Sequence, residues 1–289
     1  MPNASGKRCS HTVKVSPRFV LPNDRPALMG ILNVTPDSFS DGGLFFDDRA
    51  AVGHAETMIA EGADLLDVGG ESTRPGAPPV VEQEELRRVL PVVQALASRG
   101  WVVSIDTSKA SVARAALAAG ASMVNDVTAG RDPEMAATCA EAGATACLMH
   151  MQGEPRTMQQ DPTYTDVVTE VRAFLVERAR VFEDAGVAEV WIDPGIGFGK
   201  TVAHNLCLLR HLATLVETGY PVLIGVSRKS FIGRLLGSGG ASLPVEERLE
   251  GTLAAQAWAQ VAGCRVLRAH DVREARRTIE VLAAIAKSE

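Results

Sequence analysis

The sequence holds few cysteines, and their arrangement excludes several kinds of protein. The five cysteines among 289 residues are odd in number and widely spaced, with no C-x-x-C pair. A disulfide framework and a structural zinc site are therefore not expected. Reduced thiols of this kind are typical of a cytoplasmic protein.

Long apolar runs and an excess of positive charge are also missing. No segment reaches the roughly 18 uninterrupted apolar residues of a membrane-spanning helix, and residues 1–20 lack the apolar stretch of a secretory signal. The 29 Lys and Arg residues are scattered and outnumbered by 35 Asp and Glu residues, giving a net charge of −6. We therefore expect a soluble protein that binds neither membranes nor nucleic acid, although a few placed cations could form a local anion site.

What the chain does contain is one pattern that repeats eight times: a short apolar run, a polar residue at its end, and an amphipathic segment with helical spacing. The expected strands cover residues 27–33, 64–69, 101–106, 122–126, 144–149, 189–193, 221–226 and 265–269. The expected helices cover residues 48–60, 82–98, 109–119, 132–142, 165–185, 203–217, 246–262 and 271–287. Strands separated by helices require parallel pairing, and eight such units in about 260 residues match a (β/α)₈ TIM barrel. A doubly wound α/β sheet has the same repeats and is the alternative.

The domain organisation follows from the same pattern. No change of composition and no linker divides residues 27–289, so we expect one barrel domain. Residues 1–26 form an N-terminal extension, in which residues 11–21 alternate well enough for a short hairpin or plug strand.

Polar side chains stand at the end of every expected strand. The carboxyl ends of barrel strands carry the active site, and burying so many unpaired polar groups without a ligand would cost several kcal/mol. The strand-end residues are Asn33, Asp67, Asp106, Asn125, Asp126, His150, Asp193, Ser227, Arg228, Lys229, Arg268, His270 and Asp271.

Three of these strand ends, with a lysine, suit a flat heterocycle. Asp106, Asn125 and Asp193 supply acceptors and one amide, and Lys229 faces the same rim. A carboxylate such as Asp193 can accept two parallel N–H bonds from a guanidine-like edge. The alternative is a structural ion-pair network in which Asp193 binds Lys229.

Two cations follow the last strand. Arg268 and His270 precede a helix expected to start near Asp271, which is where barrels commonly bind phosphate. Two cations suggest an anion with more charge than a carboxylate, such as a diphosphate. A solvated R-x-H segment is the alternative.

The glycine-rich segment 194–201, P-G-I-G-F-G-K-T, resembles nucleotide motifs without matching them, since Pro194 replaces the first P-loop glycine. We interpret it as a tight loop that brings Phe198 against a bound ring.

No paired-histidine metal motif exists in the sequence. Any metal is therefore expected to be Mg²⁺, held by the Asn33 amide and the ligand's phosphates.

Residues 29–43 have the sequence M-G-I-L-N-V-T-P-D-S-F-S-D-G-G. This pattern predicts a buried strand that is followed by a polar loop. A second loop of similar character is E-S-T-R-P-G at residues 71–76. We expect both loops to move and to close over the site.

Together these motifs closely resemble the dihydropteroate synthase family of the folate pathway, over about residues 27–287. The resemblance rests on G-I-L-N-V-T-P-D-S-F-S-D-G-G (30–43), D-V-G-G-E-S-T-R-P-G (67–76), S-I-D-T (104–107), N-D-V (125–127), L-M-H-M-Q-G (148–153), D-P-G-I-G-F-G-K (193–200), G-V-S-R-K-S (225–230) and R-A-H-D (268–271).

The resemblance implies condensation of 6-hydroxymethyl-7,8-dihydropterin diphosphate with p-aminobenzoate, giving 7,8-dihydropteroate and pyrophosphate. It places the pterin on Asp106, Asn125, Asp193 and Lys229, with Met149, Phe198 and Gly225 around the ring. It places the diphosphate on Asn33, Thr73, Arg268 and His270, with Mg²⁺ on Asn33. It places p-aminobenzoate near Phe39, Ser72, Arg74, Pro75 and Ser230. Catalytic roles fall to Asp41, Lys229, Arg268 and His270.

Two other functions remain as alternatives. A pterin-binding methyltransferase shares the ring pocket but delivers a methyl group to a corrinoid, and a non-catalytic pterin-binding scaffold would lack Asp41, Arg268 or His270. All three residues are present. The resemblance further implies inhibition by sulfonamides and a homodimer.

Overall fold

The computed structural model describes residues 19–35, 48–72 and 77–288. Its parallel strands are β1 (Ala27–Asn33), β2 (Leu65–Gly69), β3 (Val103–Asp106), β4 (Met123–Asp126), β5 (Thr145–Met149), β6 (Val190–Asp193), β7 (Leu223–Ile224) and β8 (Val266–Ala269). The helices are α2 (Asp48–Ala60), α3 (Glu82–Ser98), α4 (Ala110–Ala118), α5 (Met135–Ala142), α6 (Val167–Asp184), α7 (Val202–Arg210), α8 (Leu212–Val216), α9 (Ser230–Leu236), α10 (Leu249–Val261) and α11 (Val272–Lys287), with the 3-10 turn η1 (Val245–Glu247). These bounds agree closely with the segments expected from the sequence.

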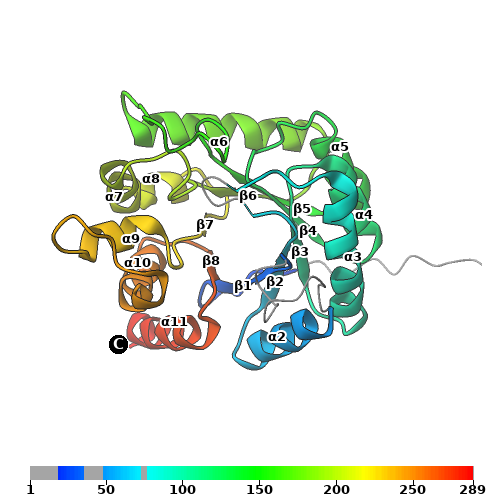
Figure 1. Cartoon of the computed structure of the whole chain (residues 1–289), viewed down its shortest axis with the longest axis horizontal. Helices are drawn as coiled ribbons and strands as arrows, with labels where there is room; N and C mark the ends of the chain where they lie inside the picture. Colours follow the sequence, from blue (N-terminus) through cyan, green and yellow to red (C-terminus); the bar gives the residue numbers. More distant parts are fainter. Residues whose placement is uncertain (1–18, 36–47, 73–76, 289) are drawn as a thin grey trace, which may run out of the picture.

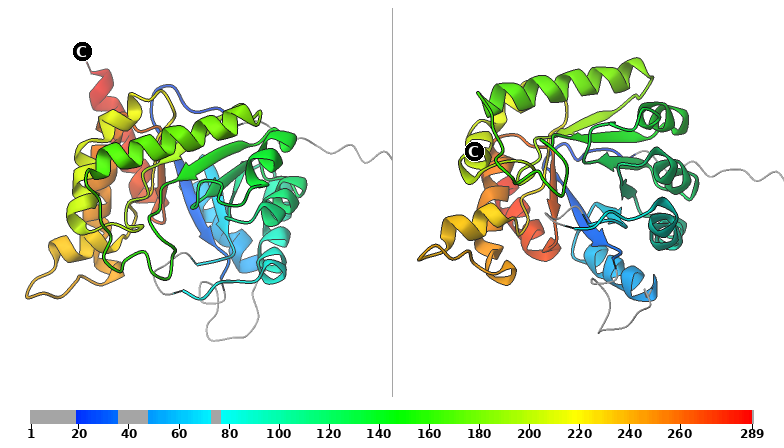
Figure 2. Two further views of the ribbon diagram at one scale, coloured as in Figure 1. Left: turned by 90° about the horizontal axis from the view of Figure 1, so that it is seen from above. Right: turned by 45° about the horizontal axis from the view of Figure 1, so that its top comes forward.

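The strands close into a barrel rather than an open sheet. Their order is β6-β5-β4-β3-β2-β1-β8-β7, and a parallel bridge between Ile192 and Val222 joins the two ends. The backbone N–H of Ile192 also donates to the carbonyl of Pro221 at 3.0 Å. The helices surround the strands (Figure 1, Figure 2). The single-domain (β/α)₈ barrel is thereby confirmed, and the doubly wound sheet is excluded.

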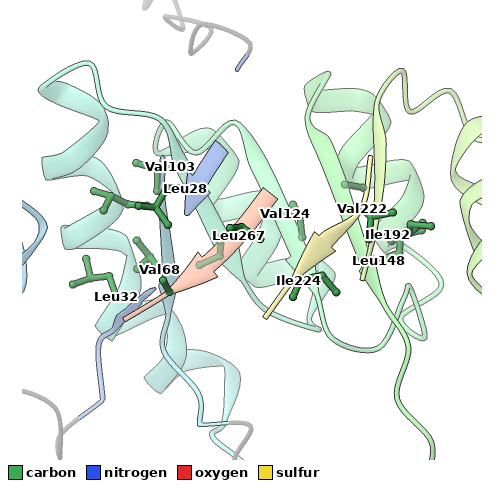
Figure 3. Packing of buried hydrophobic residues seen from close by; sticks show 14 of the residues in the cluster. Leu28, Leu32, Val68, Val103, Val124, Leu148, Ile192, Val222, Ile224 and Leu267 are labelled. Carbon is green, nitrogen blue, oxygen red and sulfur yellow. The ribbon is translucent and has the colours of Figure 1, made fainter. Parts of the chain in front are cut away.

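Two separate apolar cores follow from the alternation of side chains along each strand. Leu28 and Val68 face outward and pack with the helices in the larger core, as Figure 3 shows. Met29 and Leu65 are paired in register and face inward. They belong to a smaller core that fills the barrel interior toward the amino-terminal ends of the strands. The interior is thus a packed core beneath the strand ends.

The N-terminal segment, residues 19–26, packs against the inner core at the amino-terminal ends of the strands. Phe19 and Leu21 pack on the inner core, and the ring of Phe19 meets Trp191 edge-on at 6.2 Å between centroids. Residues 19–22 form no strand, and the rest of the predicted hairpin, residues 11–18, lies outside the described residues.

Two helical predictions were wrong in detail. The helix predicted over residues 203–217 is divided at His211, whose backbone leaves the helical region (φ −108°, ψ 25°). Helix α9 was not predicted, because seven residues are too short for their periodicity to be read. Within the described residues, no helix is long and apolar enough to span a membrane.

Candidate active site

The strand registers bring the polar residues of β2, β3 and β4 onto one inner surface. Asp67 stands two residues after the inward-facing Leu65, so it faces the barrel interior as well. Asp67 is paired with Ser104, and Asp106 is paired with Asn125. The interior therefore changes from apolar to polar toward the carboxyl ends of the strands.

A pocket opens at this end of the barrel. Its walls combine three carboxylate or amide side chains, two cations, and apolar groups that suit the faces of a flat ring. They are Asp106, Asn125, Val127, Met149, Asp193, Gly195, Ile196, Phe198, Gly225, Lys229 and Arg268.

Arg268 is held between two carboxylates. Its Nε donates to Oδ2 of Asp67 at 2.7 Å, and a terminal nitrogen donates to Oδ2 of Asp106 at 2.8 Å. Burial, followed by the negative charge of Asp67, raises the pKa of Asp106 to about 7, against the lowering effect of Arg268. A ligand that donates an N–H to Asp106 would favour its ionised form.

The amide of Asn125 is oriented by the same carboxylate. Its Nδ2 donates to Oδ2 of the fully buried Asp67 at 2.9 Å. One N–H of the amide is used in this way, so Asn125 can offer a ligand its amide oxygen as an acceptor and its second N–H as a donor.

Asp193 presents one carboxylate oxygen to its own loop and the other toward the pocket. Oδ1 accepts the backbone N–H of Gly195 at 2.7 Å, and Oδ2 lies 3.8 Å from the point where a Cβ on Gly225 would stand. Burial raises the pKa of Asp193 to about 6. No salt bridge joins Asp193 to Lys229 among the described residues, so the alternative of a direct structural ion pair is not observed.

Lys229 stacks on the aromatic ring that closes one side of the pocket. Its Nζ lies 3.9 Å from the ring centroid of Phe198, a cation–π distance. Burial, together with the charge of Arg268, lowers the pKa of Lys229 to about 8. The lysine is therefore charged at neutral pH and can donate to a ring oxygen or nitrogen.

His270 lies on the β8–α11 connection and contacts the β7 loop. Its Nδ1 is 3.0 Å from Oγ of Ser227, and its backbone N–H donates to the same oxygen at 3.2 Å. Burial, then the charge of Arg268, lowers the pKa of His270 to about 3. The protein therefore presents a neutral imidazole here rather than the cation expected from the sequence, with Nε2 as the ring nitrogen that Ser227 does not contact.

The structure brings together most of the residues singled out in the sequence. Asp106, Asn125, Met149, Asp193, Phe198, Gly225, Lys229 and Arg268 line the pocket. Asn33 ends β1, Ser72 follows β2, Ser230 begins α9, and His270 follows β8. Phe39, Asp41, Thr73, Arg74 and Pro75 lie outside the described residues.

Two buried residues were not selected as site residues. Asp67 stood among the strand-end residues, and its full burial is what marks it as a binding partner for Arg268 and Asn125. Lys200 belongs to the segment 194–201, which resembles a P-loop without matching it. It is 2% exposed, and a lysine so deeply buried requires several acceptors.

The residues present fit a magnesium ion that arrives with a phosphate ligand. Asn33 supplies an amide oxygen at the barrel rim, 3.8 Å from the point where a Cβ on Gly69 would stand. Magnesium keeps several waters and often takes only one or two protein oxygens beside substrate phosphates. Among the described residues, no group of three His, Cys, Asp or Glu side chains could hold a metal by itself.

The comparisons with known proteins agree with this site. The family described as "Pterin binding enzyme" matches residues 29–270. Dihydropteroate synthase of Escherichia coli K12 is 48% identical over 262 residues, covering 90% of this chain and 91% of the relative.

Two solved structures are similar throughout. The dihydropteroate synthase of Xanthomonas albilineans with 4-aminobenzoic acid has a TM-score of 0.85 and 48% identity, covering 92% of this chain and 95% of that chain. The Yersinia pestis enzyme in a sulfonamide drug complex has a TM-score of 0.88 and 43% identity, covering 94% and 98%.

The fold and the family match define a barrel enzyme of the pterin-binding family. More narrowly, the chain belongs to the dihydropteroate synthase family.

Proposed function

We infer that the enzyme condenses 6-hydroxymethyl-7,8-dihydropterin diphosphate with p-aminobenzoate, giving 7,8-dihydropteroate and pyrophosphate in the synthesis of folate. The observation that carries this inference is the pocket, in which Asp106, Asn125 and Asp193 offer acceptors to one flat space and Lys229 offers a donor. The similar Xanthomonas albilineans structure contains 4-aminobenzoic acid, the second substrate of this reaction.

The pterin fits the pocket through its donor-rich edge. Oδ2 of Asp193 is the acceptor for the guanidine-like N–H groups, because Oδ1 already receives the Gly195 N–H. The oxygen of Asn125 accepts another ring N–H, and Lys229 donates to the ring carbonyl. Met149, Phe198 and Gly225 surround the ring.

The diphosphate extends from the ring toward the rim, near His270 and Asn33. Arg268 contributes positive charge from the pocket wall, although Asp67 and Asp106 offset much of it. His270 donates from its neutral imidazole, and an arriving diphosphate would raise its pKa. Thr73 is a further ligand on family resemblance.

The p-aminobenzoate site is proposed on family resemblance at Phe39, Ser72, Arg74, Pro75 and Ser230. The structure describes two of these. Ser230 is the exposed first residue of α9, directly after Lys229, and Ser72 follows the end of β2. Both therefore belong to loops at the carboxyl ends of strands, on the side of the barrel where the pocket opens.

The chemistry requires stabilisation of charge more than a base. The dihydropterin nitrogen pushes electrons toward the exocyclic methylene, so the diphosphate leaves before attack. Lys229, Arg268 and His270 hold the departing anion and the ring. The aniline nitrogen is unprotonated and needs positioning. When bound, Mg²⁺ offsets the charge of the leaving diphosphate.

Asp41 is proposed to shield the pterin cation and to help hold the metal near the diphosphate. This contact matters mainly in the transition state, so Asp41→Ala should lower turnover by roughly 10²-fold or more. Binding of pterin diphosphate should change by less than about 1 kcal/mol. A large loss of pterin affinity would instead make Asp41 a ground-state ligand.

Incubation of the protein with pterin diphosphate, p-aminobenzoate and Mg²⁺ tests the proposed function through release of pyrophosphate. Omitting p-aminobenzoate is the control, and no pyrophosphate in the complete mixture would refute the activity. Repeating the assay with the metal removed by a chelator tests the proposed dependence on Mg²⁺. The cytoplasmic location stays a proposal, which cell fractionation tests.

A homodimer is also proposed. Trp258 and Val261 on α10 are 54% and 73% exposed, and Val281 and Ile285 on α11 are 60% and 62% exposed. The two helices pack on each other, since Nε2 of Gln260 donates to the Ile279 carbonyl at 3.1 Å. A second copy of the chain would cover this apolar surface.

A further inference from the structure

Among the residues that the structure describes, Lys200 is the one deeply buried lysine that the proposed reaction does not use. It is the last residue of the loop 194–200 and is not among the residues that line the pocket. Its Nζ lies within hydrogen-bond distance of the carbonyls of Phe198 (2.9 Å), Gly195 (3.0 Å) and His150 (3.3 Å), and 3.0 Å from Nδ1 of His150. Carbonyl oxygens only accept, so this set of partners suits an ammonium group.

The partners of Lys200 come from two strand ends. His150 follows β5 and is 8% exposed, while Gly195 and Phe198 belong to the loop after β6. Burial lowers the pKa of His150 to about 3, so the imidazole is neutral and its Nδ1 can accept from Lys200. One ammonium group therefore fastens the β6 loop to the end of β5.

The loop passes too close to β5 for an ordinary residue. Gly195 has φ of +66°, and a Cβ on it would stand 1.9 Å from the carbonyl oxygen of His150. Only glycine allows this approach. Lys200 supplies a donor for the carbonyls that the approach brings together.

The same loop touches two of the three charged groups that we assign to the pterin. The N–H of Gly195 donates to Asp193, and Phe198 lies under the ammonium of Lys229. A Cβ on Gly197 would stand 3.2 Å from the Lys229 side chain. Displacement of the loop would therefore disturb the main acceptor and the main donor of the pocket together.

We propose that Lys200 is a positioning residue, which holds the 194–200 loop in place and supplies a buried positive charge on the Asp193 side of the pterin pocket. This inference rests on the proposed role of the pocket. It assigns Lys200 no contact with substrate.

The positive charge of Lys200 supports its proposed effect on Asp193. Burial lowers the pKa of Lys200 to about 7, so the ammonium keeps its proton in the pH range near 6 where Asp193 titrates. Removing this charge would raise the pKa of Asp193 further. The ionisable groups that face Asp193 are Lys200 from its own loop, Lys229 from the β7 loop, Arg268 from β8, and the thiols of Cys147 and Cys264.

Lys200→Met tests the proposal. The dissociation constant for a 6-hydroxymethyl pterin should rise by roughly tenfold at pH 7, the scale of one lost charge-assisted contact. The KM for p-aminobenzoate should change by less than about twofold. Pterin affinity should fall on the acid side of its pH profile (the acid limb), and in this variant the fall should begin at a higher pH. The reason is that Asp193 then protonates at higher pH.

Two further variants separate the effect of the Lys200 charge from the effect of its hydrogen bonds to the 194–200 loop. Lys200→Gln keeps N–H donors without the charge, so it should fold even where methionine does not and should still move the acid limb upward. Tyr164→Phe removes a neutral hydrogen bond, at 2.8 Å, to the carbonyl of Gly199 in the same loop. It should leave the acid limb in place.

The outcomes of these experiments distinguish failure of the proposed function from failure of the proposed role of Lys200. A wild-type protein that binds no pterin would overturn the proposed function. Normal wild-type binding, with an unmoved acid limb in Lys200→Gln, would overturn the role of Lys200. Equal shifts in Lys200→Gln and Tyr164→Phe would also overturn it, because charge would then not be the cause.

Discussion

Arg268 and Asp67 form a salt bridge of 2.7 Å inside the barrel, and Asp67 is fully buried. The same Asp67 oxygen accepts the amide N–H of Asn125. One carboxylate thus orients two residues of the proposed pterin pocket and raises the pKa of a third, Asp106. Its contribution to binding is indirect and electrostatic.

Asp67→Asn should therefore change the pH dependence of pterin binding. Removing the negative charge lowers the pKa of Asp106, so Asp106 stays ionised at lower pH and the acid limb of affinity moves down by as much as about one pH unit. Titration calorimetry at several pH values measures this. An unmoved limb would show that Asp67 does not control Asp106.

In the unaltered enzyme, pterin affinity should have a bell-shaped dependence on pH. Asp106 and Asp193, with pKa values of about 7 and about 6, must both be ionised to accept, so affinity falls below neutral pH. Lys229, with a pKa of about 8, must be protonated to donate, so affinity also falls above pH 8. A pterin without the diphosphate should be used, so that phosphate titration does not contribute. A flat profile between pH 5.5 and about 9 would contradict these roles.

The sequence was sufficient to predict the barrel and its strand ends, because each repeat joins an apolar run to a polar residue. It could not predict the contact between Arg268 and Asp67. These residues are 201 positions apart, and they meet only because closure of the barrel brings β8 beside β1, one strand away from β2. The sequence therefore assigned Arg268 to the diphosphate alone, whereas the structure places it against two carboxylates of the pocket.

The neutral state of His270 was also beyond sequence reasoning. A histidine after the last strand reads as a cation beside Arg268. Its pKa falls because burial and the charges of Arg268 and Arg228 disfavour protonation. Burial and charge of this kind depend on how the β7 and β8 loops pack, which spacing along the chain does not determine.

Asp193→Asn should weaken pterin binding by roughly 2–4 kcal/mol, the scale for breaking a buried charge-assisted pair. The substitution places a donor where the ring presents its own N–H groups. Calorimetry provides the measurement. Asp166→Asn is a matched control, because Asp166 caps α6 at 3.0 Å from the N–H of Val168 and is exposed. Near-normal pterin binding by Asp193→Asn would remove Asp193 from the site.

Sulfonamides should inhibit the enzyme in competition with p-aminobenzoate, whose length and aniline they copy. Support comes from the similar Yersinia pestis enzyme, which has been solved in a sulfonamide drug complex. Steady-state kinetics should show a raised KM for p-aminobenzoate at unchanged kcat. No competition at concentrations well above that of p-aminobenzoate would contradict the proposed site near Ser72 and Ser230.

The proposed homodimer predicts that the apolar surface of α10 and α11 is covered in solution. Sedimentation at micromolar concentration should give about twice the chain mass of 30.6 kDa. Val261→Glu combined with Ile285→Glu should yield the single-chain mass, because each carboxylate would be buried without a partner. Val20→Glu serves as the control, since Val20 is 80% exposed and lies outside these helices, so the dimer should persist. A wild-type protein that sediments only as one chain would refute the dimer, and a dimer that survives the double substitution would place the interface elsewhere.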